Sequence, residues 1–424
     1  MLGGTVLVGL SGYVYFAVIG HGRFDPTIAA ALAATYLLSN ILGPGVFIAA
    51  EQEASRAISA QRAGTGVVPG TARRLALICV ALGVLTTMVL AACAPMLLTN
   101  VLDGNGGLLL ALLLAVVGSA AVYYVRGLSG GQQRFHRYAV TTGIDGAARI
   151  AACLALAAAG ATDPVAYALA LCAGPAVAAV LTLRGAGPRT ARPTDPSPGD
   201  SASTGELPTF SGLGRGVAYL LVASFVSLAM ANLAPVIVTG MTGTDPVGAT
   251  GFAAAVVLTR VPLLLMGPVQ ALILPRLTLA ANSGRLADFR RDTATGLAII
   301  GGLAVVSIVV VALLGGWALQ VLVGAENATA STGVLVLLTL SAMLQMAVQF
   351  LQPALVAVRR HRQLVVAWVC GGAAFGLAFL IPLEPIDRGV LAQLVGPVVT
   401  LVLELVALHR VITMTAHPVR QPRS

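Results

Sequence analysis

The chain alternates between long apolar stretches and short polar segments. Most apolar stretches are close to the about 20 residues that a helix needs to cross the hydrocarbon core of a bilayer. The pattern therefore predicts an all-α integral membrane protein with about twelve transmembrane helices. The predicted spans are Val6–Gly20, Thr27–Ala50, Leu75–Ala94, Leu108–Val125, Ala139–Gly160, Val165–Leu183, Val217–Gly240, Val247–Leu274, Gly296–Leu314, Gly333–Val358, Leu364–Leu383 and Val390–Leu408.

Two of these spans, the second and the eighth, carry signals for an interruption. The second follows Asp25-Pro26, reaches Ser39-Asn40 and then meets Gly43-Pro44. The eighth follows Asp245-Pro246, holds Arg260 and Pro262 near its centre, and then meets Gly267-Pro268. Proline and glycine inside a span free backbone groups, and a broken helix is tolerated in a membrane where it lines water or protein. We therefore expect both helices to border the functional site.

The sequence also indicates a duplication. Asp-Pro and Gly-Pro recur in the same order in both halves, and Arg134-Phe135-His136-Arg137 is matched by Arg359-Arg360-His361-Arg362. Six spans per copy is an even number, so the copies have the same orientation and form a parallel repeat. The predicted domains are an N-terminal lobe of six helices (1–183), a cytoplasmic linker rich in Pro, Ser and Gly (184–215), a C-terminal lobe of six helices (216–409) and a cytoplasmic tail (410–424).

Composition and charge agree with a membrane protein and set its orientation. The chain is 57% hydrophobic and 10% charged, and its mean hydropathy is +0.91, which lipid as the solvent explains. All 25 basic residues are Arg, and 21 of them lie in the loops after even-numbered spans and in the tail. This bias predicts that both termini are cytoplasmic. It also explains the net charge of +9 by topology and contact with anionic membrane lipid, so we expect no nucleic-acid partner.

The chain lacks the residues that several kinds of functional site require. The chain has no Lys and no G-x-x-x-x-G-K-[ST] motif, which excludes a P-loop for ATP. All five cysteines lie inside apolar spans without a C-x-x-C pair, so we expect neither a disulfide nor a metal site. We expect no catalytic residues and no cofactor. Arg without Lys is typical of GC-rich coding and suggests a bacterial plasma membrane.

Charged residues inside spans are the first candidates for a site, because charge near the midplane costs about 3 kcal/mol or more. Arg260 is such a residue, either facing an aqueous cavity or forming a structural ion pair. Arg149 follows Asp145 by one helical turn, so the two form either a self-neutralising pair or a substrate or proton site. Glu404 lies near the cytoplasmic end of the last span. Its side chain is expected to extend toward the interface near Arg410, and ion coupling is the alternative.

Polar residues at helical spacing form three further candidate surfaces. The tenth span carries Gln345, Gln349 and Gln352; the second span carries Asn40 and the seventh Asn232. These side chains either join helices by hydrogen bonds or line a shared polar cavity. The segment Glu51–Arg74 predicts a short amphipathic helix, with Ala54 and Ile58 on its apolar face, that lies on the inner leaflet.

The Gly-Pro interruptions, the two parallel halves and the basic stretch after span 4 resemble the multidrug/oligosaccharidyl-lipid/polysaccharide (MOP) exporter superfamily. The branch that they are most similar to is the polysaccharide transporter branch, which includes O-antigen-type flippases. The resemblance covers nearly the whole chain and implies a MATE-like, V-shaped pair of bundles around a central cavity. It further implies export of a polyprenyl-diphosphate-linked oligosaccharide by alternating access, with H⁺ or Na⁺ as the coupling ion. Arg260 and Arg149 are the positions that could bind the diphosphate, since the Arg fork suits phosphate oxygens.

Partners implied by this resemblance are the anionic lipid-linked glycan and the glycosyltransferases or polymerase of the same pathway. The nearest alternative is a MATE-type multidrug or cation antiporter, for which Asp145 rather than Arg260 should be essential. A membrane-embedded glycan polymerase or glycosyltransferase is a further alternative. It is disfavoured because the longest outer loop, around residues 314–332, offers a single acidic residue, Glu326.

Overall fold

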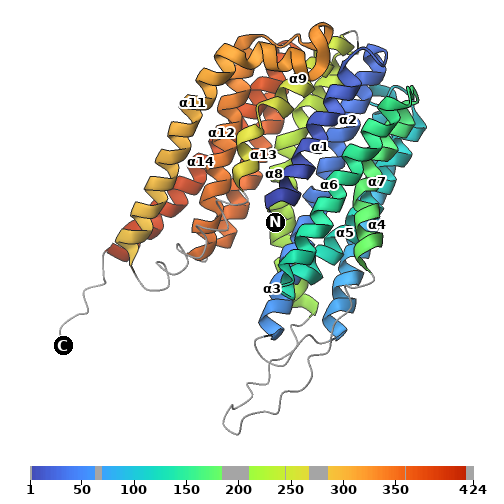
Figure 1. Cartoon of the computed structure of the whole chain (residues 1–424). Helices are drawn as coiled ribbons and strands as arrows, with labels where there is room; N and C mark the ends of the chain where they lie inside the picture. The colour runs from blue at the N-terminus through green and yellow to red at the C-terminus, as the bar shows by residue number, and fades with distance from the viewer. Residues whose placement is uncertain are drawn as a thin grey trace, which may run out of the picture. The chain divides into compact units, whose positions relative to one another are not determined.

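The computed structural model describes residues 2–62, 69–183, 210–243, 245–266, 285–358 and 360–416, and most of the described residues are helical. Figure 1 shows these helices along the chain. They are α1 (Leu2–Gly20), α2 (Pro26–Leu42), α3 (Pro44–Arg62), α4 (Pro69–Asn100), α5 (Gly106–Gly131), α6 (Phe135–Ala158), α7 (Pro164–Leu183), α8 (Phe210–Met241), α9 (Pro246–Leu258), the short 3-10 helix η1 (Val261–Leu265), α11 (Leu286–Asn327), α12 (Thr332–Ala357), α13 (His361–Ala378) and α14 (Pro385–Ala416).

The prediction of an all-α membrane protein is confirmed. Eleven helical stretches in the described part of the chain are long and apolar enough to cross a membrane, and Arg362–Ala378 is a shorter apolar helix. The stretch Ala287–Asn327 illustrates why lipid must be the solvent: only 6% of its most apolar window is buried against protein. Large apolar side chains such as Val305 and Leu313 on α11 are exposed, and water would penalise each of them.

The helices form two compact units. The first holds residues 1–253 and 322–327, and the second holds residues 254–321 and 328–424. In the first unit α1 packs on α6, α5 packs on α7, and α8 packs on α2 and α3. In the second, α14 packs on α12 and α13. The first unit is larger than the predicted first lobe because α8 and part of α9 pack within it. The parallel repeat stays a prediction, and most of the predicted linker lies outside the described residues.

Both predicted interruptions are present where the structure describes them. Helix α2 ends at Leu42, and Gly43 has non-helical angles (φ −84°, ψ −90°) before Pro44 starts α3. A Cβ atom at Gly43 would lie 2.6 Å from Ser119 Oγ, so the absence of a side chain lets the break pack against α5. Helix α9 ends at Leu258, and Arg260 precedes η1. The Gly267-Pro268 pair lies outside the described residues.

Helix α3 corrects one prediction. Residues 51–62, the first part of the segment expected to lie on the inner leaflet, belong to α3, which packs against α5 and α8. Ala54 and Ile58 are buried at 1% and 0% exposure, and Glu51 on the same face is buried with them. Residues three and seven positions apart share a helix face, so burial of the apolar positions carries the carboxylate inward.

The Asp-Pro starts act as helix caps at two of three sites. Asp245 Oδ1 accepts a hydrogen bond from the Gly248 amide at 2.8 Å, and Asp163 Oδ1 accepts one from Val165 at 3.0 Å. Asp25 makes no side-chain cap bond.

Asp245→Ala is therefore expected to lower the free energy of unfolding by about 1 kcal/mol, because it removes an acceptor from the first turn of α9. Asp25→Ala is the control, with a smaller expected loss because no cap bond is removed. Thermal unfolding in detergent measures both. Equal losses for the two variants would contradict the assignment of Asp245 as the working cap.

Candidate functional site

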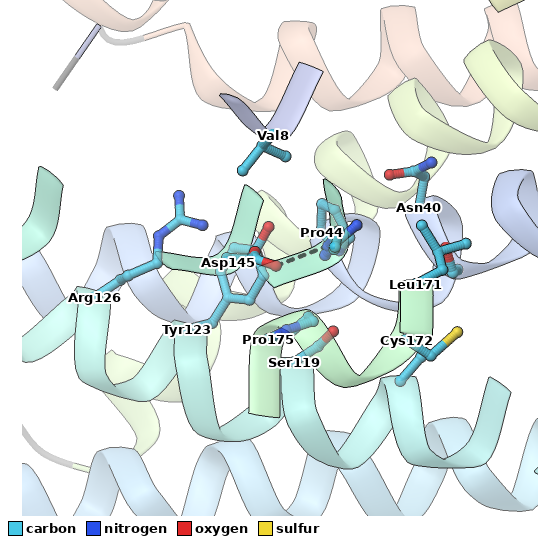
Figure 2. A pocket seen from close by; sticks show the side chains of 13 residues that line it. Val8, Asn40, Pro44, Ser119, Tyr123, Arg126, Asp145, Leu171, Cys172 and Pro175 are labelled. Atoms are coloured by element: carbon cyan, nitrogen blue, oxygen red, sulfur yellow. Dashed lines mark hydrogen bonds and ion pairs between the residues drawn. The ribbon is translucent and has the colours of Figure 1, made fainter. Parts of the chain in front are cut away.

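A polar pocket lies inside the first unit, at the junction of α2 and α3 and against α5, α6 and α7. Its volume is about 40 Å³, room for about three water molecules at the roughly 10–15 Å³ that each one needs. Figure 2 shows how its side chains converge. The lining residues are Val8, Ser39, Asn40, Pro44, Ala115, Ser119, Tyr123, Arg126, Asp145, Arg149, Leu171, Cys172 and Pro175.

One wall of the pocket is an ion pair within α6. Arg149 Nε donates to Asp145 Oδ1 at 2.8 Å, and the two side chains are 12% and 6% exposed. Helix α7 covers this pair closely because residue 174 is glycine: a Cβ there would lie 2.5 Å from Arg149 Cγ and 2.8 Å from Asp145 Oδ1. The pair predicted from the i,i+4 spacing is therefore present. No Nη atom of Arg149 donates a hydrogen bond to any residue in the described part of the chain, which leaves these donors for a ligand or water.

A second buried cluster holds Arg126 on α5 beside the pocket. Arg126 Nη2 donates to Tyr138 Oη at 2.8 Å, and Tyr138 Oη donates to Glu51 Oε1 at 2.7 Å. Arg126 Nε lies 3.2 Å from Glu51 Oε2. The guanidinium carbon also lies 4.6 Å from the ring centre of Tyr123 and 5.0 Å from that of Tyr138, distances suited to cation–π contact. We call Glu51, Arg126 and Tyr138 the three-helix cluster, because they join α3, α5 and α6.

Charge in the pocket wall is positive on balance. Arg126 and Arg149 line it with one acidic residue, Asp145. Glu51 balances Arg126 from behind, and Asp145 is already bonded to Arg149. A cation entering this pocket would find its carboxylate occupied, whereas an anion would find guanidinium donors. Groups of three or more His, Cys, Asp or Glu side chains that could hold a metal ion are absent from the described residues.

The structure brings together three of the predicted site residues. Asn40 lines the pocket with Asp145 and Arg149, and its Nδ2 donates to Tyr36 O at 3.0 Å, so part of its polarity serves α2 itself. Asn232 lies in the same unit but does not line the pocket; its Nδ2 donates to Leu228 O at 2.9 Å.

The remaining predicted residues belong to the second unit. Arg260 lies at the junction of α9 and η1, and Thr259 Oγ1 beside it donates to Ala255 O at 2.9 Å. Gln345, Gln349 and Gln352 lie on α12, where Gln345 is 5% exposed. The chamber predicted between the two bundles depends on how the units face each other and stays a prediction.

Glu404 corrects a second expectation. The side chain does not extend toward the interface: its residue on α14 is 0% exposed. Neither carboxylate oxygen has a hydrogen-bond partner among the residues that the structure describes.

Sequence reasoning missed the three-helix cluster. Glu51 and Arg126 lie just beyond the predicted ends of spans 2 and 4, which places them in predicted loops. One signal could have found them: Glu51 shares a helical face with Ala54 and Ile58, which predicts burial and so demands a cationic partner.

Comparison with known proteins adds relatives without an assigned activity. No family model matches the chain. Among curated sequences, the uncharacterized protein Rv3630 of Mycobacterium tuberculosis is 31% identical over 206 residues, which is 46% of this chain and 44% of that protein. The uncharacterized protein Rv1510 of the same species is 30% identical over 222 residues, 52% of this chain and 49% of that protein. The matches thus span about half the length of these relatives.

Solved structures show the fold over nearly the whole chain. A multidrug resistance MATE family transporter of the MOP superfamily, in an inward-facing conformation, matches with a TM-score of 0.73 at 12% identity, covering 97% of this chain and 95% of that one. The lipid II flippase MurJ matches with a TM-score of 0.62 at 11% identity, covering 96% and 86%. The MATE multidrug transporter DinF-BH matches with a TM-score of 0.59 at 15% identity, covering 96% and 93%. These neighbours are transporters and a flippase rather than enzymes, and the chain has the MATE-like fold that they share.

Proposed function

We propose that this protein is a flippase that moves a polyprenyl-diphosphate-linked oligosaccharide or polysaccharide precursor across a bacterial plasma membrane by alternating access. The fold is that of MOP-type transporters, and the same fold serves multidrug transporters and a lipid II flippase. The substrate must therefore be argued from the site. The observation that carries the proposal is the pocket of the first unit, where Asp145 is already bonded to Arg149 Nε while the Nη atoms of Arg149 donate to none of the described residues.

An anionic substrate fits this charge arrangement better than a cationic drug. A cation would have to displace Arg149 from Asp145, breaking a charge-assisted bond of 2.8 Å between side chains that are nearly buried. A phosphoryl oxygen needs no such exchange, because it can accept from the Nη groups of Arg149 while Nε stays bonded to Asp145. Arg260 of the second unit is the other phosphate contact that we propose.

The small volume of the pocket limits what enters it. About 40 Å³ admits water or the oxygens of one phosphoryl group, and it cannot admit a sugar. We propose that one phosphoryl group of the diphosphate binds in this pocket while the glycan and the polyprenyl chain remain outside it. Asn40, which lines the pocket, is a proposed contact of that phosphoryl group, and Asn232 and the Gln345, Gln349 and Gln352 stripe are proposed glycan contacts.

Both termini are proposed to be cytoplasmic, on the strength of the arginine bias. Proposed partners are the lipid-linked substrate, membrane lipid and the glycosyltransferases or polymerase that make and use the substrate. H⁺ or Na⁺ is proposed as the coupling ion, with Asp145 as one candidate group.

Drug export is the second candidate function, because two of the three neighbours with this fold are multidrug MATE transporters. It predicts that expression raises resistance to cationic dyes and that Asp145→Asn abolishes this resistance.

Arg149→Ala and Arg260→Ala are each expected to lower export of surface glycan at least about tenfold, because each removes charge-assisted bonds of about 1.5–3 kcal/mol to the diphosphate. The measurement is surface glycan, together with the lipid-linked precursor left on the inner leaflet, in cells whose only copy is the variant. Arg285→Ala is the matched control, since Arg285 pairs with Asp288 at 57% and 56% side-chain exposure.

A double variant separates substrate binding from charge balance at Arg149. Asp145→Asn with Arg149→Ala removes the pair without leaving a buried carboxylate alone. Export should stay low in the double variant if Arg149 binds substrate. Recovery of export in the double variant would show that Arg149 only neutralises Asp145. Normal surface glycan in both single variants, together with raised dye resistance in cells that express the parent protein, would favour drug export.

A further inference from the structure

The second unit contains a buried carboxyl group that the site described above does not use. Glu404 lies on α14 at 0% exposure, and neither of its oxygens has a hydrogen-bond partner in the described part of the chain. Arginine does not approach it within ion-pair distance among those residues. An ionised carboxylate buried without a partner is strongly unfavourable, and such a group takes up a proton instead.

The register of α13 against α14 places the indole of Trp368, a second unsatisfied polar group, at the level of Glu404. A Cβ atom at Gly371 on α13 would overlap Thr400 Oγ1 and would lie 2.9 Å from Gly396 O, so residue 371 faces residues 396–400 of α14. The two helices follow each other through a short connection and run antiparallel. The residue one turn before Gly371 on α13 therefore faces the residue one turn after Thr400 on α14. These residues are Trp368 and Glu404, so the two lie at the same level of the seam.

Trp368 has the matching property. It is 0% exposed, and its Nε1 has no acceptor among the described residues. An indole N–H is a donor only, and a carboxylate oxygen is an acceptor. The two groups are not hydrogen-bonded to each other in this structure, so the seam holds two buried polar groups of complementary kind that are both unsatisfied.

Other titratable groups do not face this position. Helix α12, which also packs on α14, carries no titratable residue. On α13, Arg362 and Cys370 are exposed, and on α14 Asp387, His409 and Arg410 are exposed; the side chain of His361 lies outside the described set. The other polar groups near this level are Thr400, whose hydroxyl donates to Gly396 O at 3.0 Å, and the indole of Trp368; α13 also carries Gln363, whose Oε1 is buried without a hydrogen-bond partner among the described residues.

We propose that Glu404 is a proton-binding site in the seam between α13 and α14, and that the indole of Trp368, at the same level of the seam, senses its protonation state. One H⁺ adds to a carboxylate oxygen when the seam is closed, and the same H⁺ leaves to water when the seam opens. A proton suits the site better than Na⁺, because hard cations need several oxygen ligands and an N–H group offers none. The role in coupling rests on the proposed transport function, whereas proton binding itself does not.

Two spectroscopic readouts test proton binding without any transport assay. The chain has two tryptophans, and Trp317 is 65% exposed, so Trp317→Phe leaves Trp368 as the only tryptophan, whose emission is separated from that of tyrosine by excitation at the red edge of the absorption band. In that background, raising the pH is expected to shift Trp368 emission, and Glu404→Gln is expected to abolish the shift. In infrared difference spectra of the purified protein, a protonated-carboxyl band should be lost on the same substitution. Asp387→Asn, an exposed carboxyl on the same helix, is the control and should change neither signal.

Three outcomes would overturn the proposal. The carboxyl band could persist in Glu404→Gln, the emission could respond to Na⁺ and not to pH, or the carboxyl could stay protonated at every pH at which the protein is folded. Gln mimics the neutral acid in shape, so the variant is expected to fold, and its melting temperature checks this. Transport in liposomes then separates the two proposals. Loss of the pH dependence of transport in Glu404→Gln supports coupling. Normal glycan export by the Arg149 variants would contradict the proposed substrate, and it would not affect the proposal that Glu404 binds a proton.

Discussion

Replacing Arg126 by alanine is expected to lower the free energy of unfolding by about 3–5 kcal/mol. The reason is that Glu51, at 8% side-chain exposure, would be left buried beside Tyr138 without its cation. The loss should be measured as reduced thermal stability in detergent and as reduced yield in the membrane. Glu51→Gln alone should also destabilise the protein, because Arg126 would then be the unpaired charge.

Two further variants make this prediction specific to the three-helix cluster. Glu51→Gln combined with Arg126→Met removes both charges, and it should recover most of the stability, since replacing a buried pair by neutral groups costs little. Arg285→Ala breaks an exposed pair and should cost at most about 1 kcal/mol. A double variant no more stable than Arg126→Ala would show that packing of the Arg126 side chain, rather than charge, holds α3, α5 and α6 together.

Gly146→Ala is the second substitution with a large expected effect, a loss of about 1–3 kcal/mol from overpacking. Residue 146 lies where α6 meets α1, and an added Cβ would be 2.5 Å from Leu7 C and from Val8 N. These are backbone atoms, which cannot rotate away as a side-chain end can. The two helices would have to separate, and small residues are what lets membrane helices approach this closely.

Gly143→Ala makes the same change one turn earlier on the same helix, as the control. A Cβ there would have only Gly4 Cα within 4.0 Å. Alanine is the better helix former by about 0.8–1 kcal/mol, so this variant should be as stable as the parent or more stable. Melting temperatures of the two variants in the same detergent provide the test. Equal destabilisation by both would contradict the close contact between α1 and α6.

The membrane spans and the helix breaks could be predicted from the sequence because their causes are local. Apolar length gives a span, and Gly43-Pro44 and Pro262 give the interruptions of α2 and of the α9–η1 segment. The Asp145–Arg149 bond was also predictable, because residues four apart on one helix are neighbours.

The three-helix cluster could not be predicted in the same way, since it needs contacts between segments far apart in the chain. The ends of α3 and α5 extend past the apolar stretches that predict them, so Glu51 and Arg126 looked like loop residues. The prediction for the Glu404 side chain was wrong for a related reason. Its short distance from the interface suggested an outward side chain, and only the packing of α13 on α14 decides that it points inward.

The three-helix cluster has a consequence for how the protein is made. Tyr138 follows Glu51 by 87 residues, so α3 leaves the ribosome long before the helices that neutralise it. Glu51 lies at the end of the apolar stretch of α2–α3, where water can solvate it or it can stay a neutral acid until α5 and α6 have been inserted. We therefore expect the three-helix cluster to form only after α6 has been made, so that α3 takes its final packing later than its own synthesis.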